Sequence, residues 1–231
     1  MKFSCNQQTL SKALNTVSKA VTSRTTIPIL KGILLEVNGD NTLTLSASDL
    51  DLSIEKKIEV TAEEVGSVVV SARLFSDIIR KLPNEEIQIE EQENNTIVIK
   101  CLASEFTIVG QPADEFPNIG EINLEKKLSL DKDILKEMIK KTSFAASIDE
   151  SKGIIVGVLV EMEEESLNMV ALDGFRMAIT REVMKNEEKK KIINSARILN
   201  EINKIISENE DGKEIFFILD EKKAVFLMDE T

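Results

Sequence analysis

The sequence contains no histidine, tryptophan or tyrosine among its 231 residues. Without an imidazole it cannot build a histidine general base, a Ser-His triad or the usual catalytic zinc site. Its nine glycines form neither a G-x-G-x-x-G nor a Walker phosphate loop. Acidic pairs such as Asp49 and Asp51 could hold Mg²⁺, but we interpret them as solvated surface because no nucleophile accompanies them. We therefore expect neither an enzyme nor a bound metal or cofactor.

Cysteine and long apolar runs are equally scarce. Cys5 and Cys101 are too few for a disulfide scaffold or a four-ligand metal site, so we expect two buried, reduced thiols. The opening MKFSCNQQTLSK lacks the apolar segment of a secretory signal. The longest apolar run, residues 153–160, is far shorter than the ~20 residues that span a bilayer. We expect a folded cytoplasmic protein.

One pattern occurs twice along the chain. Blocks that begin GILLEV, LTLSAS, SARLFS and EIQIEE in the first half return in the same order 124 to 128 residues later. Alternating apolar residues in each copy predict antiparallel strands. Apolar residues at helical spacing predict two helices per copy, at 7–21 and 71–82 and then at 131–142 and 195–206.

This repeat predicts an α+β fold of two similar domains. Their expected bounds are 1–118 and 128–231, and residues 119–127 form the linker. The second copy has no counterpart of the strand around 106–109, so we expect that domain to be incomplete and the chain to be truncated at Thr231.

Positive charge is concentrated on the predicted helices. The chain has 29 Lys and Arg against 41 Asp and Glu, whereas the four helices have 11 against five. At about 100° per residue, most of these cations lie opposite the apolar stripe of their helix. On the second helix we expect the stripe to be Leu74, Phe75, Ile78 and Leu82. The candidate cations are Lys12, Lys19, Arg73, Arg80, Lys136, Lys140, Arg197 and Lys204.

The cations form either an ordinary solvated face or a surface for a long anion. Phosphate contacts through Lys and Arg give affinity without sequence information. The absence of interleaved aromatic residues disfavours base stacking. The sequence favours contact with the backbone of duplex DNA, and the alternative is an acidic protein–protein scaffold whose helices bind an acidic partner.

Three segments resemble the bacterial sliding clamp, the beta subunit of DNA polymerase III. They are the opening MKF, the segment RTTIPIL that leads to GILL at 32–35, and DGFRM at 173–177. The resemblance covers the whole chain. It implies a non-catalytic processivity factor for DNA replication, in which two subunits of three domains close head to tail around the duplex. Each domain would turn two helices toward a central hole, with antiparallel sheets outside.

The resemblance also implies that the chain holds domains one and two and lacks domain three, so that alone it would be monomeric. Arg24 would touch the DNA backbone beside the helix cations; the alternative is a plain loop arginine. The loop 147–155 would approach DNA through Lys152, since Asp149 and Glu150 in the same loop are acidic.

The resemblance places Phe106 and Ile108 on the strand that pairs with the partner subunit's third domain. The pattern alone indicates alternating core residues at these two positions.

A second candidate surface comes from a difference between the two copies. Apolar residues at 50, 52 and 54 of the first copy align with Gly174, Arg176 and Ala178 of the second, where the apolar residues have moved by one position. This shift indicates either a β-bulge or alignment slip that restores burial, or an outward apolar patch.

The resemblance places here a groove, shared with domain three, for short peptides of the replicative polymerase and the clamp loader. The matching residues are Ile155, Leu172, Gly174, Phe175, Arg176 and Met177.

Overall fold

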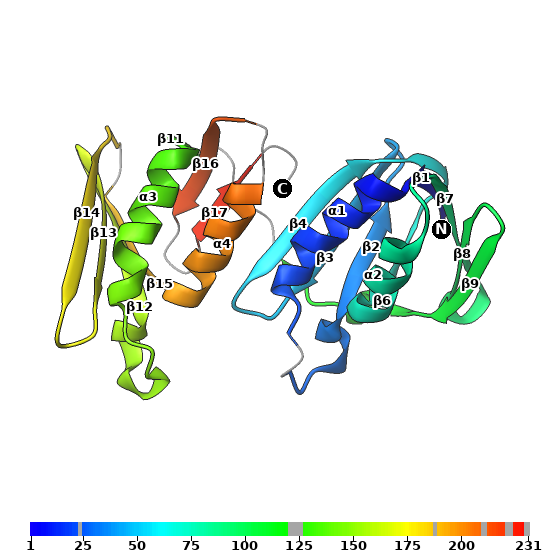
Figure 1. Ribbon diagram of the computed structural model, residues 1–231, viewed down its shortest axis with the longest axis horizontal. Coiled ribbons are helices and arrows are strands. Elements are labelled where there is room, and N and C mark those ends of the chain that lie inside the picture. The colour runs from blue at the N-terminus through cyan, green and yellow to red at the C-terminus, as the bar shows by residue number, and fades with distance from the viewer. Residues whose placement is uncertain (23–24, 120–126, 187–188, 209–211, 220–223, 229–231) are drawn as a thin grey trace. The chain divides into compact units, whose positions relative to one another are not determined.

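The computed structural model describes residues 1–22, 25–119, 127–186, 189–208, 212–219 and 224–228 (Figure 1). The chain divides into two compact units, Met1–Gly120 and Glu121–Asp229. Most of the expected linker, residues 120–126, lies outside the described residues. Each unit is built from helices and antiparallel strands, as the sequence predicts.

The first unit contains two five-stranded sheets, with the strand orders β5-β1-β7-β8-β9 and β10-β6-β2-β3-β4. Its elements are β1 (Lys2–Asn6), α1 (Gln7–Val17), β2 (Gly32–Val37), β3 (Thr42–Ser48), β4 (Ser53–Glu59), β5 (Thr61–Glu64), β6 (Gly66–Ser71), α2 (Ala72–Lys81), β7 (Glu86–Gln92), β8 (Thr96–Cys101), β9 (Ser104–Val109) and β10 (Gln111–Pro112).

The second unit repeats this plan with fewer described strands. Its sheets have the orders β11-β16-β17 and β14-β13-β12-β15, which correspond to β1-β7-β8 and β4-β3-β2-β6 of the first unit. Its elements are β11 (Leu128–Asp131), α3 (Lys132–Thr142), β12 (Gly157–Glu163), β13 (Ser166–Leu172), β14 (Met177–Val183), β15 (Lys190–Ser195), α4 (Ala196–Glu208), β16 (Glu214–Leu219) and β17 (Ala224–Leu227).

In each unit the two helices lie side by side on one sheet. In the first unit α1 packs on β3 and β4 while α2 packs on β2 and β6, and in the second α3 and α4 pack in the same way on β13–β14 and β15 (Figure 1). Leu10, Leu14 and Val17 of α1 are fully buried. On α1 the apolar stripe found in the sequence is therefore the face that the helix turns to its sheet.

The helices differ from the predicted ones in two details. The first α-helix ends at Val17, and the expected continuation to residue 21 is a short 3₁₀ helix, Ser18–Ala20, followed by extended backbone. In the stripe expected on α2, Phe75 and Leu82 are buried, but Leu74 is 50% exposed and Ile78 half-buried, and Ala72 and Ile79 complete the buried face. The ~100° spacing places Leu74 at the edge of the stripe, where apolar periodicity alone does not settle burial.

The two cysteines are free and buried, as predicted. Burial raises the pKa of the Cys5 thiol to about 12, because the thiolate loses its hydration inside the protein. Within the described ranges, no helix is both long and apolar enough to cross a bilayer.

Candidate nucleic-acid and partner-binding surfaces

Each pair of adjacent helices is joined by a polar contact as well as by its core. In the first unit, the buried Gln7 side chain at the start of α1 donates from Nε2 to the Ile79 carbonyl of α2 at 2.8 Å. In the second unit, the Ser143 hydroxyl after α3 donates to Asn200 Oδ1 of α4 at 3.0 Å. The outer faces of both helices in a unit therefore form one surface.

The N-termini of α1 and α3 are capped by the side chain of the residue that precedes each helix. Asn6 accepts a hydrogen bond from the Gln8 amide at 2.8 Å, and Asp131 accepts from the Asp133 amide, also at 2.8 Å. Such caps satisfy amide groups that have no partner within the helix. Ser71 precedes α2, but its side chain makes no capping hydrogen bond.

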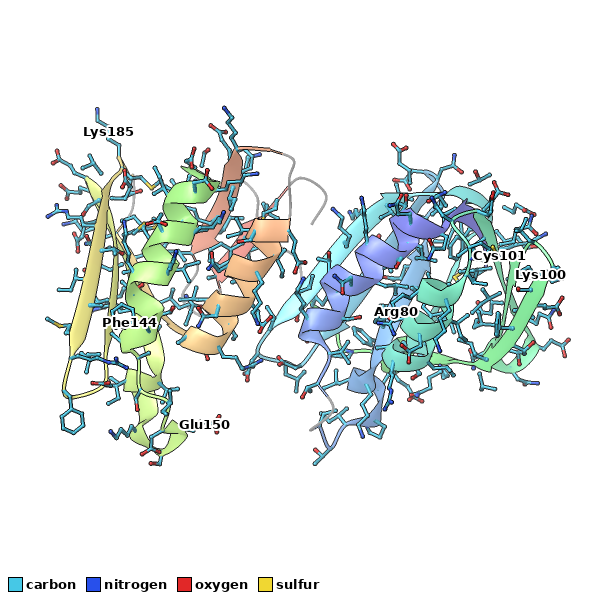
Figure 2. The ribbon with its side chains drawn as sticks, in the orientation of Figure 1. Arg80, Lys100, Cys101, Phe144, Glu150 and Lys185 are labelled. Atoms are coloured by element: carbon cyan, nitrogen blue, oxygen red, sulfur yellow. The ribbon has the colours of Figure 1, made fainter. Side chains whose placement is uncertain are left out.

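The predicted cations lie on these helix surfaces. Arg73 and Arg80 are exposed on α2, and Arg80 is labelled in Figure 2. The other exposed members are Lys12 of α1, Lys140 of α3, and Arg197 and Lys204 of α4; Lys19 and Lys136 are half-buried. Lys152 is exposed on the 3₁₀ segment Glu150–Val156, and Arg24 lies outside the described residues.

Several of these cations already have an acidic neighbour on their own helix. Arg80 contacts Asp77 at 2.6 Å, Lys204 contacts Glu201 at 2.7 Å, and Lys136 contacts Asp133 at 3.3 Å. Among the described residues, Lys12 and Arg73 form no ion pair. The helix surfaces therefore present both unpaired and paired cations, which suits weak contacts with a polyanion.

The described residues contain no group of three or more Cys, Asp or Glu side chains arranged to hold a metal ion. The acidic pair Asp49–Asp51 belongs to a turn, in which Asp49 Oδ1 accepts the Leu52 amide at 2.7 Å and the Asp51 amide at 3.1 Å. This carboxylate stabilises the turn.

The second surface is built on the turn that joins β13 to β14. Asp173 Oδ1 accepts the amides of Phe175 and Arg176 at 2.9 and 3.0 Å, and its Oδ2 accepts Arg176 Nε at 2.9 Å. These hydrogen bonds, led by the one from Phe175, hold the pKa of Asp173 below its usual value. Gly174 has φ +95°, a conformation that favours glycine.

The turn in the first unit has the same construction, which decides how the two copies align. Ser48 pairs with Ser53 across the first hairpin and Leu172 pairs with Met177 across the second, and both ladders continue without a register shift. Leu50 has φ 76°, matching Gly174 in the second turn. A bulge or an alignment slip is therefore excluded, and the apolar residues of the second copy have changed faces.

This change of face creates an exposed apolar patch. Phe175 is 95% exposed, Met177 62% and Ile179 58%. In the first unit the inward positions of β4 hold the buried Ile54 and Ile58. The inward positions of β14 hold Ala178, Thr180 and Glu182, which are half-buried. Of the two alternatives that the repeat left open, the outward patch is the one found on this strand and its turn.

The remaining groove candidates lie near the patch with different exposures. Leu172, at the end of β13, is 36% exposed, and Ile155 is half-buried. The Ile155 carbonyl accepts the Ser147 amide at 2.9 Å, which closes the base of the 147–155 loop. Lys152 of that loop lies with Nζ 5.8 Å from the centre of the Phe175 ring, so it belongs to this patch.

Phe106 and Ile108 lie on β9, the edge strand of its sheet. They point to the same face as their partners Ile99 and Ile97 on β8. Ile108 is buried, but Phe106 is 42% exposed, because no further strand covers it in this unit. The alternation is as predicted, while full burial of Phe106 is not found.

Comparisons with known proteins identify the family. The family model for the N-terminal domain of the DNA polymerase III beta subunit matches residues 1–120, and the model for the central domain matches residues 129–231. The chain belongs to the DNA polymerase III beta subunit family. The repeated fold is the sliding-clamp fold.

Relatives and solved structures agree with this assignment. The beta sliding clamp of Bacillus subtilis is 34% identical over 236 residues, covering 98% of this chain and 62% of that protein. The sliding-clamp crystal structure from Bacillus subtilis superposes with a TM-score of 0.95 at 32% identity. A putative beta subunit from Eubacterium rectale gives a TM-score of 0.93 at 35% identity. In both structures the match covers all of this chain and 62% of the other.

The structure adds one residue to the beta-subunit groove candidates that sequence reasoning missed. Phe144, labelled in Figure 2, is 59% exposed after α3, and the Arg176 guanidinium lies 5.6 Å from the centre of its ring. Ile148 and Ile154 are also exposed in the neighbouring loop. In the sequence, the only sign of this role was that Phe144 is a large apolar residue among polar and small ones. Its contact with Arg176 could not be predicted, because it depends on the fold.

Proposed function

We propose that this chain provides the first two domains of a sliding clamp that contacts the backbone of duplex DNA. The supporting observation is that two units of one fold each present a pair of adjacent helices with exposed Lys and Arg, although the chain as a whole is acidic. Phosphate contacts of this kind are independent of sequence. They therefore suit a protein that must move along DNA.

The proposed mechanism is topological and requires no catalysis. A ring closed around the duplex cannot dissociate sideways, so weak phosphate contacts suffice to keep a polymerase on its template. In this proposal the helix cations contact DNA directly, with Arg24 and Lys152 as further contacts. The edge strand β9, with Phe106 at its rim, joins the partner subunit in the complete ring.

We further propose that the patch around Phe175 and Met177 binds short peptides of the replicative polymerase and the clamp loader. The exposed apolar side chains supply the contact area, and the turn carboxylate of Asp173 holds Arg176 in place. A partner peptide should lose affinity for the Met177→Ser variant, with Val183→Ser as a control at an exposed position six residues along the same strand.

The DNA contact is tested by reversing four helix charges, in the variant Arg73→Glu, Arg80→Glu, Arg197→Glu and Lys204→Glu. All four side chains are exposed, so we expect the protein to remain folded. Its affinity for a duplex of arbitrary sequence should fall by at least about tenfold at low salt, with a shallower dependence on salt.

A control variant with four exposed strand or turn cations replaced by Glu, at Lys57, Lys100, Lys185 and Lys191, should bind more strongly than the helix variant. If both variants bind equally, the helices are not the contact surface. If the unmodified chain shows no salt-dependent binding, the scaffold alternative is favoured.

A further inference from the structure

The same pattern of charges runs along the outer face of α2 and α4. In each helix a cation is followed by an acid four residues later and a second cation after three more, a spacing that places all three on one face. The two sets are Arg73, Asp77 and Arg80 on α2, and Arg197, Glu201 and Lys204 on α4. Because they are related by the 124-residue repeat, the acid is part of the repeated surface.

In both helices the acid holds the second cation. Arg80 Nη2 lies 2.6 Å from Asp77 Oδ1, and Lys204 Nζ lies 2.7 Å from Glu201 Oε1. The cations of these pairs remain largely exposed, and exposed ion pairs contribute little to stability. A contribution to helix stability therefore does not explain why both α2 and α4 have such an ion pair.

The acid has a direct effect on a phosphate contact. To reach a phosphate, the Arg80 guanidinium must leave or share its carboxylate partner, and that carboxylate repels the same phosphate. α1 shows the contrasting case at Lys12, because Thr16 stands four residues after it and the described helix contains no acid. The described helix surfaces thus contain cations held by an acid, Arg80 and Lys204, and a cation without an ion pair, Lys12.

We propose that Asp77 and Glu201 are positioning residues that weaken the phosphate contacts of Arg80 and Lys204. This inference rests on the proposed DNA contact and adds that the contact is limited by acids within the contact surface itself. A phosphate contact that competes with an internal carboxylate is easily broken, which allows the protein to exchange one phosphate for the next.

The test is the double variant Asp77→Asn and Glu201→Gln, which keeps side-chain size and removes both charges. We expect affinity for a duplex of arbitrary sequence to rise about fivefold at low salt, roughly two- to threefold for each pair. The slope of log affinity against log salt should become steeper by up to ~0.9 for each cation released. A merely structural role of the acids would leave this slope unchanged.

A matched control removes two acids of ion pairs outside the helices, Glu105→Gln and Glu164→Gln. These pair with Lys100 on β8 and with Lys189, so the net charge changes by the same amount. The control should change neither affinity nor slope by as much as the helix variant. An equal change would show a general charge effect and overturn the inference.

The reverse substitution gives a second, independent readout. Thr16→Glu places an acid four residues after Lys12 on α1, and we expect it to lower duplex affinity about two- to threefold. If the unmodified chain binds duplex DNA but none of these variants changes the slope, the inference fails and the proposed function stands. If the unmodified chain shows no salt-dependent binding, both fail.

Discussion

Leu50 has a left-handed backbone conformation, and the equivalent position of the second unit is a glycine, Gly174. Leu50 has φ 76° and its side chain is mostly exposed, while Gly174 occupies the equivalent place at φ +95°. A left-handed conformation costs a residue with a side chain roughly 1–2 kcal/mol. The hydrogen bonds that Asp49 accepts from the two following amides, at 51 and 52, hold the turn closed despite this cost.

We therefore expect Leu50→Gly to stabilise the first unit. Relief of the backbone cost exceeds the extra freedom that glycine gains in the unfolded chain, about 0.4–1 kcal/mol, so the net gain should be about 0.5 kcal/mol. Chemical denaturation measures it. Gly174→Leu should change stability in the opposite direction, and a loss of stability in Leu50→Gly would contradict this account of the turn.

Cys5 gives a prediction about pH. Burial raises the pKa of its thiol to about 12, above the ordinary value near 9, so folding favours the protonated form. Its contribution to stability is complete below about pH 9 and is lost as pH rises toward 12, by up to about 1.4 kcal/mol per pH unit.

Unfolding free energies of the protein and of Cys5→Ala measure this effect. The variant should be less stable at pH 7, because a buried side chain is shortened, and the difference between the two proteins should narrow above pH 9. The absence of tyrosine leaves fewer other groups titrating in this range. If the difference in unfolding free energy between the two proteins stayed constant up to pH 11, the raised pKa of the Cys5 thiol would be contradicted.

At the scale of elements, the repeat and the apolar periodicity predicted the four helices to within a few residues and the antiparallel strands of both copies. What they could not decide was the face of β14. The alternation at 175–179 was compatible with inward burial through a bulge, and the choice depends on the turn geometry at Asp173 and Gly174. Likewise, the apolar alternation placed Phe106 in the core pattern, and only the family resemblance indicated a strand with a free edge there.

Equivalent substitutions on β4 and β14 test this assignment of faces. Ile54→Thr places a hydroxyl at a buried position and should cost about 2 kcal/mol or more. Ile179→Thr alters an exposed side chain and should change stability by no more than about 0.5 kcal/mol. Denaturation of both variants checks the comparison. Equal losses would mean that Ile179 is buried and that the outward patch does not exist.

At the scale of the whole molecule, the net charge and the proposed DNA contact point in opposite directions. A chain with 41 acids and 29 Lys and Arg would ordinarily be a poor candidate for binding DNA. The excess of acid lies outside the four helices, while cations gather on the paired helices of each unit. The sequence predicted this division because charge could be counted by element, but the acid–cation contacts on α2 and α4 required the structure.

The central claim is that duplex DNA is contacted by the helix faces of both units, and lysine footprinting tests it most directly. An amine-acylating reagent would be applied with and without duplex DNA at low salt, and the modified sites identified by mass spectrometry. We predict that duplex DNA protects Lys12 on α1 and Lys204 on α4, while Lys57 on β4 and Lys191 on β15 keep their reactivity. Uniform protection of all four lysines, or protection of the strand lysines alone, would contradict the account.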